Sequence, residues 1–243
     1  MEILLTIDDT DNLESVGTGE LCENIASHIE ARGWGHCSGI TRHQLYVHED
    51  IPYTSHNSSM CFRAHIDGKQ LPSIIDFASR FLESESAQGS DPGLCVLNTE
   101  NLDNPHLLMD FGRKAKRQVL TKDEAYALAK ELNIHLSEHG GTGDGIIGAL
   151  AGTGLRMTGN DGRFKGHHQI PSSDGTASVA ALLQHPGIDM VQGLQGQVLE
   201  MTTPISLSKK VKTVLLNDQA VLLVYQDKDQ IWRNCTKQHL KGY

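Results

Sequence analysis

The stretch EILLTIDDTD, residues 2–11, decides the fold of this chain. Its first part, Glu2–Ile7, is apolar at residues 3–5 and again at residue 7, which is typical of a buried strand. Its second part places three carboxylates within four residues at the end of that strand: Asp8, Asp9 and Asp11. The sequence therefore predicts a buried strand that ends in an acidic loop.

The acidic loop indicates a metal site. Carboxylates this close repel one another and lose solvation, and a bound divalent cation relieves both costs. Mg²⁺ takes hard oxygen ligands and often bridges one or two carboxylates to substrate phosphates. On an extended segment Asp9 and Asp11 point to one side and Asp8 to the other. We predict all three as catalytic and metal-binding residues; the alternative is a turn whose aspartates cap the next helix.

Three residues, Gly17, Thr18 and Gly19, begin a helix predicted over Thr18–Glu30. A helix start offers free N–H groups and the positive end of the helix dipole, which favour a phosphate oxygen. Thr18 is either the N-cap of this helix or a hydroxyl that acts on phosphate beside the acidic loop. We predict Thr18 as a catalytic residue and the two glycines as nucleotide-binding residues.

A glycine-rich segment, GGTGDG over residues 140–145, precedes an apolar helix predicted from Ile146. Its glycines let backbone amides approach an anion closely. No Gly-Lys-Ser/Thr follows, so the segment is not a Walker A loop. The alternative is a flexible turn. We predict that the whole segment binds the nucleotide: Gly140, Gly141, Thr142, Gly143, Asp144 and Gly145.

Further polar residues flank two predicted strands, Ile40–Val47 and Met60–Ile66. Substrate pockets in α/β proteins open where strands end. These side chains either line such a pocket or are ordinary loop residues: Arg42, His43, Tyr53, His56 and Asn57.

The remaining pattern predicts an α/β protein, in which a mixed sheet has flanking helices and a small C-terminal β appendage follows. Helices are predicted at Leu71–Leu82, at Pro105–Lys116 and after a capping box that begins at Thr121. Short strands follow Pro204, over Lys212–Leu216, Ala220–Tyr225 and Gln230–Cys235. We therefore expect a main α/β domain over residues 1–204 and a small β segment over residues 205–243.

Composition excludes several classes of protein. The five cysteines contain no Cys-x-x-Cys pair, which argues against a zinc ribbon or a disulfide framework. No apolar run reaches the roughly 18 residues that cross a bilayer, and the N-terminus lacks the features of a signal peptide. We expect a cytoplasmic protein.

The net charge of the chain bears on whether it binds nucleic acid. The net charge of −9 argues against a surface that holds phosphate backbones throughout. Residues 205–243 differ, since they carry seven Lys or Arg against three Asp, which is a net +4. RNA binding, if present, is therefore expected in this last segment.

In this order the motifs resemble the kinase-like domain of the archaeal tRNA agmatinylcytidine synthetase family, which attaches agmatine to an anticodon cytidine. The resemblance runs over residues 1–157 and rests on the acidic loop, Thr18, Ile51-Pro52-Tyr53 with Asn57, and Ile147-Gly148-Ala149-Leu150-Ala151. It implies Mg²⁺- and ATP-dependent phosphoryl transfer, with metal and nucleotide phosphates on Asp8, Asp9 and Asp11 and phosphate uptake by Thr18. The family's OB-fold and zinc ribbon are expected to be missing.

We therefore predict a kinase-like or ligase-like transferase that uses Mg²⁺ and ATP, with a small-molecule or nucleoside-like acceptor. One alternative is a haloacid-dehalogenase-like phosphatase, in which Asp9 and Asp11 act on phosphate and Gly143–Gly145 imitates a second metal motif. The other is a non-catalytic nucleotide- or RNA-binding regulatory module. The expected partners are a nucleotide and a small molecule, with RNA not favoured and no membrane; homo-oligomerisation stays open.

Overall fold

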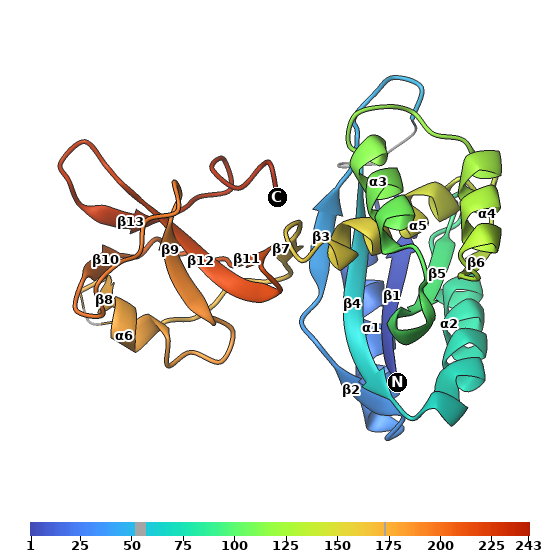
Figure 1. Cartoon of the computed structure of the whole chain (residues 1–243), viewed down its shortest axis with the longest axis horizontal. Coiled ribbons are helices and arrows are strands. Elements are labelled where there is room, and N and C mark those ends of the chain that lie inside the picture. Colours follow the sequence, from blue (N-terminus) through green and yellow to red (C-terminus); the bar gives the residue numbers. More distant parts are fainter. Residues whose placement is uncertain (52–56, 173) are drawn as a thin grey trace. The chain divides into compact units, whose positions relative to one another are not determined.

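The computed structural model describes residues 1–51, 57–172 and 174–243. The chain divides into two compact units, unit 1 over Met1–Thr158 and unit 2 over Gly159–Tyr243 (Figure 1). Within the described ranges, no helix combines the length and the apolar character that a membrane span needs. The predicted residues Tyr53 and His56 lie outside the described residues.

Unit 1 is built on an antiparallel sheet. Its strands follow the order β6-β5-β1-β4-β3, and β2 also pairs with β4. The strands are β1 (Glu2–Asp8), β2 (Gly35–Cys37), β3 (Thr41–Gln44), β4 (Ser58–Ile66), β5 (Gly93–Asn98) and β6 (His135–Glu138). Strand β1, which was predicted from residues 2–7, therefore lies inside the sheet, with β4 and β5 as its neighbours.

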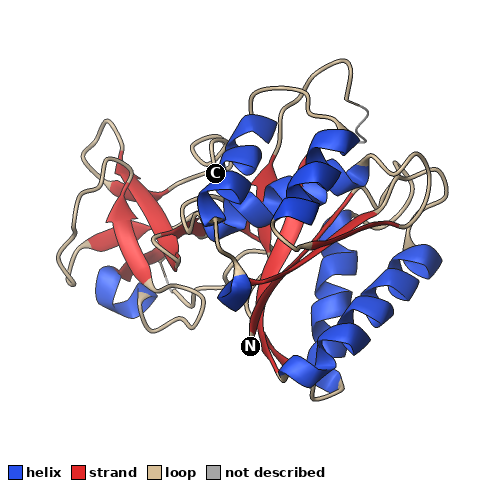
Figure 2. Cartoon of the chain, turned by 45° about the vertical axis from the view of Figure 1, so that its right-hand side comes forward, coloured by secondary structure: helices blue, strands red, loops and turns tan. Residues whose placement is uncertain are grey.

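Helices cover both faces of this sheet (Figure 2). On one face, residues of α1 and α2 pack with Ile3, Leu5 and Ile7 of β1, and on the other face residues of α3, α4 and α5 pack with Leu4. The helices are α1 (Thr18–Ala31), α2 (Leu71–Glu85), α3 (Pro105–Ala115), α4 (Lys122–Glu131) and α5 (Gly145–Met157). The mixed α/β class predicted from the sequence is confirmed.

Two polar side chains of β1 lie on the face of the sheet that packs against α5. Because side chains in a strand alternate between faces, Thr6 and Asp8 share the face of Leu4. The hydroxyl of Thr153 in α5 donates to the Thr6 hydroxyl over 2.7 Å, and both residues are fully buried. This hydrogen bond joins β1 to the second half of α5.

Unit 2 is mainly β structure. Its strands follow the order β7-β11-β12-β13-β10-β8, with β9 parallel to β12. The elements are β7 (Arg163–Phe164), β8 (Thr176–Ser178), α6 (Val179–Leu182), β9 (Met190–Gly193), β10 (Pro204–Ser206), β11 (Val214–Leu216), β12 (Gln219–Gln226) and β13 (Trp232–Asn234). The three strands predicted near the C-terminus are present as β11, β12 and β13.

The predicted domain boundary at Pro204 differs from the observed division at Thr158 and Gly159. Pro204 and Ile205 pair with Ser178 and Ala177, so β10 forms a ladder with β8 from the earlier segment. Likewise β9 pairs with β12. Residues 159–204 therefore belong with the C-terminal strands, because their ladder partners lie there, and the β unit is larger than the sequence indicates.

Candidate nucleotide site in unit 1

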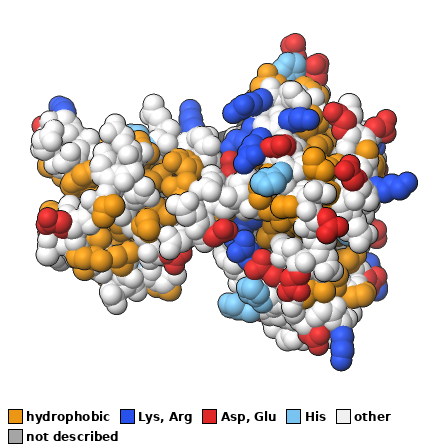
Figure 3. All heavy atoms as spheres, viewed as in Figure 1, with side chains coloured by type: hydrophobic (Ala, Val, Ile, Leu, Met, Phe, Trp, Pro, Cys, Tyr) orange, Lys and Arg blue, Asp and Glu red, His pale blue; other side chains and the backbone are white. Residues whose placement is uncertain are grey.

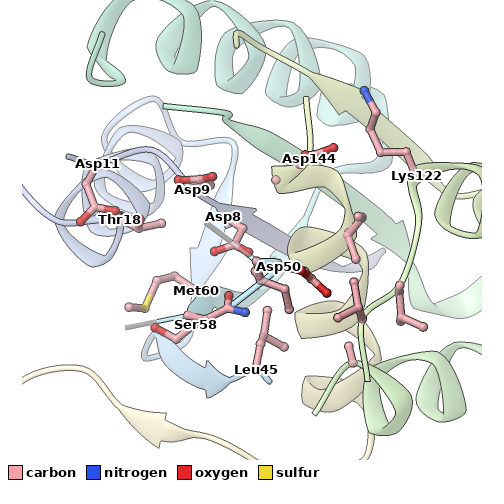
Figure 4. A pocket seen from close by; sticks show the side chains of 18 of the residues that line it. Asp8, Asp9, Asp11, Thr18, Leu45, Asp50, Ser58, Met60, Lys122 and Asp144 are labelled. Atoms are coloured by element: carbon pink, nitrogen blue, oxygen red, sulfur yellow. Dashed lines mark hydrogen bonds between the residues drawn. The ribbon is translucent and has the colours of Figure 1, made fainter. Parts of the chain in front are cut away.

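A cavity of about 650 Å³ lies in unit 1, where β1 ends (Figure 4). Its size falls within the range typical of small-molecule sites. Most of the residues predicted from sequence line it: Asp8, Asp9, Asp11, Gly17, Thr18, Gly19, Asp144 and Gly145. Two segments far apart in sequence, the acidic loop and the start of α5, therefore contribute to one site.

Asp8 lies at the bottom of this site, against helix α5. Its residue is only 8% exposed, and a Cβ placed on Gly148 would collide with the Oδ2 atom of Asp8. Glycine at position 148 therefore leaves the space that the carboxylate occupies. Burial raises the pKa of Asp8 well above its ordinary value, and the neighbouring charges of Asp9 and Asp11 raise it further. A buried carboxyl of this kind favours a proton or a cation beside it.

Asp9 turns the chain away from the strand. Its φ of 51° lies in the left-handed region, which non-glycine residues rarely adopt but aspartate tolerates. The extended alternation expected for Asp9 and Asp11 is therefore interrupted. Burial raises the pKa of Asp9 to about 6, and the charges of Asp91, Asp11 and Asp144 act in the same direction. Negative charge thus gathers from three segments of the chain around Asp9.

Thr18 is held by the acidic loop. Its hydroxyl donates to Oδ1 of Asp11 over 2.8 Å, and the residue is 6% exposed. The N-cap of α1 is Gly17, which makes no side-chain capping bond. The alternative that Thr18 caps the helix is therefore wrong. Thr18 instead opens the helix and directs its hydroxyl at a carboxylate of the cavity.

The glycine-rich segment reaches the cavity only at its end. Of the six predicted residues, Asp144 and Gly145 line the cavity, whereas the preceding four do not. The Thr142 N–H donates to the carboxylate of Asp91, and the Gly145 N–H donates to the Asp91 carbonyl over 3.1 Å. Positive φ angles, such as 57° at Gly141, let the segment wrap around this aspartate.

The structure therefore does not bring Gly140, Gly141, Thr142 and Gly143 to the predicted nucleotide site. The amide of Thr142 already serves Asp91, an intramolecular carboxylate. The second metal motif of the phosphatase alternative is divided in the same way, since Gly143 packs on Glu138 while its neighbour Asp144 faces the cavity. A partner distant in sequence, Asp91, accounts for this outcome.

Two helix starts face the same cavity. Gly17 and Asp144, the N-caps of α1 and α5, both lack a side-chain capping bond, and the first turns of both helices line the cavity. At α5 the N–H groups of Gly145, Ile146 and Ile147 already donate to backbone carbonyls, so this helix contributes its positive dipole end. The start of α1 can offer backbone N–H groups as well as its dipole, and both helix starts favour an anion there. The site therefore combines groups that attract a phosphate with carboxylates that attract a cation.

Two cationic side chains also line the cavity, Arg42 and Lys122. The Arg42 Nε donates to the Ser58 hydroxyl over 2.8 Å. The Lys122 ammonium lies 3.4 Å from the Glu138 carboxylate and also contacts the Thr142 carbonyl. Lys122 is not among the residues predicted from the sequence, although the predicted capping box, confirmed at Thr121 and Glu124, places it in the first turn of a helix.

The other polar candidates separate into two groups. Asn57 lines the cavity and donates from its amide to the Tyr46 carbonyl over 2.6 Å. His43 does not line it: the ring is fully buried, with Nε2 2.8 Å from the Thr41 hydroxyl oxygen. His43 therefore belongs to the interior of the sheet.

No preformed metal centre exists among the described residues, since no three His, Cys, Asp or Glu side chains converge as one would require. Metal binding by Asp8, Asp9 and Asp11 stays a prediction. The acidic residues nevertheless fit a metal that arrives with a nucleotide, because Mg²⁺ needs only one or two protein carboxylates when phosphates and water supply its other ligands. The raised pKa values of Asp8 and Asp9 have the direction expected for carboxyls that lack a counter-charge.

No protein-family model matches the chain. A curated relative, an uncharacterized protein of Methanocaldococcus jannaschii, is 30% identical over 160 residues, which cover 63% of this chain and 50% of that protein. The chain therefore spans half the length of this relative.

Solved structures similar to this chain include TiaS, a tRNA agmatidine synthetase. The complex of TiaS with tRNA and ATP is 26% identical, with a TM-score of 0.55 over 63% of this chain and 36% of the TiaS chain. Apo TiaS is 25% identical, with a TM-score of 0.54 over 63% and 35%. A tRNA fluorescent labeling enzyme matches at 26% identity and a TM-score of 0.55, over 63% and 36%.

The matches cover 63% of this chain, which is close to the fraction of the chain that unit 1 makes up, 158 of 243 residues. The chain spans about a third of each of these solved structures. It therefore shares with TiaS a fold that makes up part of that enzyme, and the resemblance predicted from sequence is confirmed at this level.

Proposed function

We propose that unit 1 is an Mg²⁺- and ATP-dependent phosphoryl-transfer domain, kinase-like or ligase-like, that acts on a small-molecule or nucleoside-like acceptor. The observation that carries the proposal is the meeting of two helix starts, both without side-chain caps, with Asp8, Asp9, Asp11 and Asp144 at one cavity. Anion-attracting and cation-attracting groups in one site fit a metal–polyphosphate better than either ion alone. The likeness to TiaS, which was solved with ATP, supports the same proposal.

In this proposal each group has a separate task. The start of α1 would bind phosphate oxygens through backbone N–H groups, and the dipole of α5 would attract them from the other side. Asp9 and Asp11 would hold the metal, which would supply positive charge at the phosphates. Thr18, fixed by its hydrogen bond to Asp11, orients a hydroxyl toward the phosphates. Asp8, buried against Gly148, fixes the end of β1 under the site.

Calorimetry of Mg-ATP binding tests the proposal. We expect Asp9→Asn and Asp11→Asn each to weaken binding by about tenfold or more, because a metal–phosphate bridge loses a ligand. Asp103→Asn is the matched control, since this aspartate is exposed and does not line the cavity. Wild-type affinity in both site variants would contradict the assignment.

Mass spectrometry after incubation with Mg-ATP identifies the chemistry. ADP indicates kinase-like transfer, AMP indicates ligase-like activation, and a phosphate on Thr18 shows that its hydroxyl is an acceptor. Hydrolysis of an aryl phosphate without ATP would instead favour the phosphatase alternative.

The alternative of a non-catalytic RNA-binding module draws on the net positive charge of unit 2. Unit 2 has nine Lys or Arg against seven Asp or Glu, a net +2, whereas unit 1 has twelve against 23, a net −11. An RNA-binding role would place contacts in unit 2. A gel shift with tRNA that weakens steeply as salt rises supports this role, and the absence of a shift contradicts it.

A further inference from the structure

The cavity of unit 1 has two chemically different ends. The acids Asp9, Asp11 and Asp144 lie toward the helix starts, and Leu45 lies on the other side of Asp8 (Figure 4). Around Leu45 the wall holds apolar side chains beside polar ones such as Ser58 and Asp50 (Figure 4). We name its apolar part the apolar shelf and define it by five cavity-lining residues: Leu45, Ala115, Val119, Leu120 and Ile147.

The shelf is continuous with the hydrophobic core. Leu45, Ala115 and Leu120 belong to one buried cluster, at 6%, 7% and 7% exposure, and Ile147 packs against it. Val119 differs, because it lines the cavity while 43% of it is exposed. An apolar side chain that lines a cavity and keeps much of its surface in water leaves contact area for a ligand.

Hydrogen bonds fix the shape of the shelf. The Tyr46 N–H donates to the Ala115 carbonyl over 2.9 Å and so joins the segment after β3 to the end of α3. The Leu45 N–H donates to the Asn57 carbonyl over 2.9 Å, and the Gln44 side-chain amide donates to the same carbonyl over 2.7 Å. These bonds fix the Leu45 and Ala115 parts of the shelf.

We infer that the shelf binds the planar ring of the nucleotide base and that Val119 determines how well it does so. This inference rests on the proposed function, because it assigns one end of the same cavity. A flat apolar ring gains most from an apolar wall, whereas a polyphosphate with its metal fits the helix starts and acids at the other end. Gln118, which also lines the cavity and is exposed, supplies a side-chain amide for the ring edge.

The test compares two ligands that differ in the ring. Calorimetry measures the Kd of Mg-ATP and of Mg-tripolyphosphate for the wild type and for Val119→Trp, whose bulk occupies the shelf. We expect the variant to weaken Mg-ATP by about tenfold, the scale of one lost ring contact, and to leave Mg-tripolyphosphate within about twofold of wild type. Val119→Ser, which removes apolar surface without bulk, should weaken Mg-ATP alone by a smaller factor.

The control is Leu107→Trp, which places the same large side chain on α3 at a residue that is 42% exposed and does not line the cavity. Equal weakening of both ligands by Val119→Trp would overturn the inference, and so would unchanged affinity for Mg-ATP. A wild-type protein that binds neither ligand contradicts the proposed function itself. Wild-type binding with no effect at Val119 contradicts only the assignment of the shelf.

Discussion

Units 1 and 2 use their polar residues differently. In unit 1, Thr6, Asp8 and Thr153 are buried between the sheet and α5, and two helix starts face a cavity. In unit 2, the apolar clusters lie among short strands, and large apolar side chains such as Val198, 94% exposed, lie on the surface. In Figure 3 charged side chains crowd the visible face of unit 1, while apolar ones cover much of that of unit 2. Exposed apolar side chains such as Leu13, 84% exposed, also occur in unit 1, so it is buried polarity beside a cavity that distinguishes unit 1.

The strongest test of this comparison separates the units. Each unit has its own apolar clusters, so a fragment of residues 1–158 should fold and bind Mg-ATP with the affinity of the full chain. A fragment of residues 159–243 should show no Mg-ATP binding. Circular dichroism and calorimetry on both fragments make the measurement. Nucleotide binding that requires both fragments together would break the comparison.

The next largest effect is expected at Gly148. A valine side chain would displace the Asp8 carboxylate, so we expect Gly148→Val to lower the free energy of unfolding by roughly 1–3 kcal/mol and to abolish Mg-ATP binding. Urea unfolding and calorimetry measure the two effects. The control is Leu222→Ala in the core of unit 2, where Leu222 is fully buried. It should cost roughly 2–5 kcal/mol without changing Mg-ATP affinity; a loss of affinity in the control would argue that the units are coupled.

Two single groups, Asp9 in unit 1 and His168 in unit 2, should respond to pH with opposite signs. Burial raises the pKa of Asp9 from 3.8 to about 6, so without metal the folded state binds more protons and stability falls as pH rises through this window. In unit 2, burial lowers the pKa of His168 below 6.5, and His185 and Lys212 act in the same direction. Stability there is present above pH 6.5 and is lost as pH falls.

Urea unfolding with a chelator, at pH 4.5 and pH 7, tests these signs through single variants. Relative to wild type, Asp9→Asn should gain stability as pH rises, because the variant lacks the carboxyl that resists ionisation. His168→Gln should gain relative stability as pH falls. If the stability of both variants relative to wild type changed in the same direction between pH 4.5 and pH 7, the opposite pKa shifts of Asp9 and His168 would be contradicted.

The smallest effect is expected at Thr18. Thr18→Val removes the hydrogen bond to Asp11 and keeps the shape of the side chain, so it should cost about 1 kcal/mol of stability. If the hydroxyl acts on phosphate, turnover falls much further than Mg-ATP affinity does. Thr18→Ser is the matched control because it keeps the hydroxyl. Equal turnover in the valine and serine variants would limit Thr18 to a structural role.

Local patterns were readable from the sequence. The strand predicted over Glu2–Ile7 is β1, one residue longer, and the capping box at Thr121 is present with both of its hydrogen bonds. Both depend on residues that are close in the sequence, where propensity and spacing act directly. The acidic loop and the start of α1 were placed at one site for the same reason.

Features that depend on contacts between residues far apart in the chain could not be predicted from the sequence. The glycine-rich segment wraps around Asp91, about fifty residues earlier in the chain, and no local pattern reveals that partner. The apolar shelf joins Leu45 to Val119 through folding alone. The predicted domain boundary at Pro204 differs from the observed one for the same reason. Pro204 begins strand β10, whose ladder partner β8 lies earlier in the chain.

The pairing of acids with helix starts has a consequence for the order of events. Carboxylates around Asp9 repel a bare nucleotide and attract a divalent cation, because their full charges outweigh the partial charges of the two helix starts. On the proposed function, the nucleotide would therefore enter together with its metal, and the concentration of free metal would set the occupancy of the site as much as that of the nucleotide.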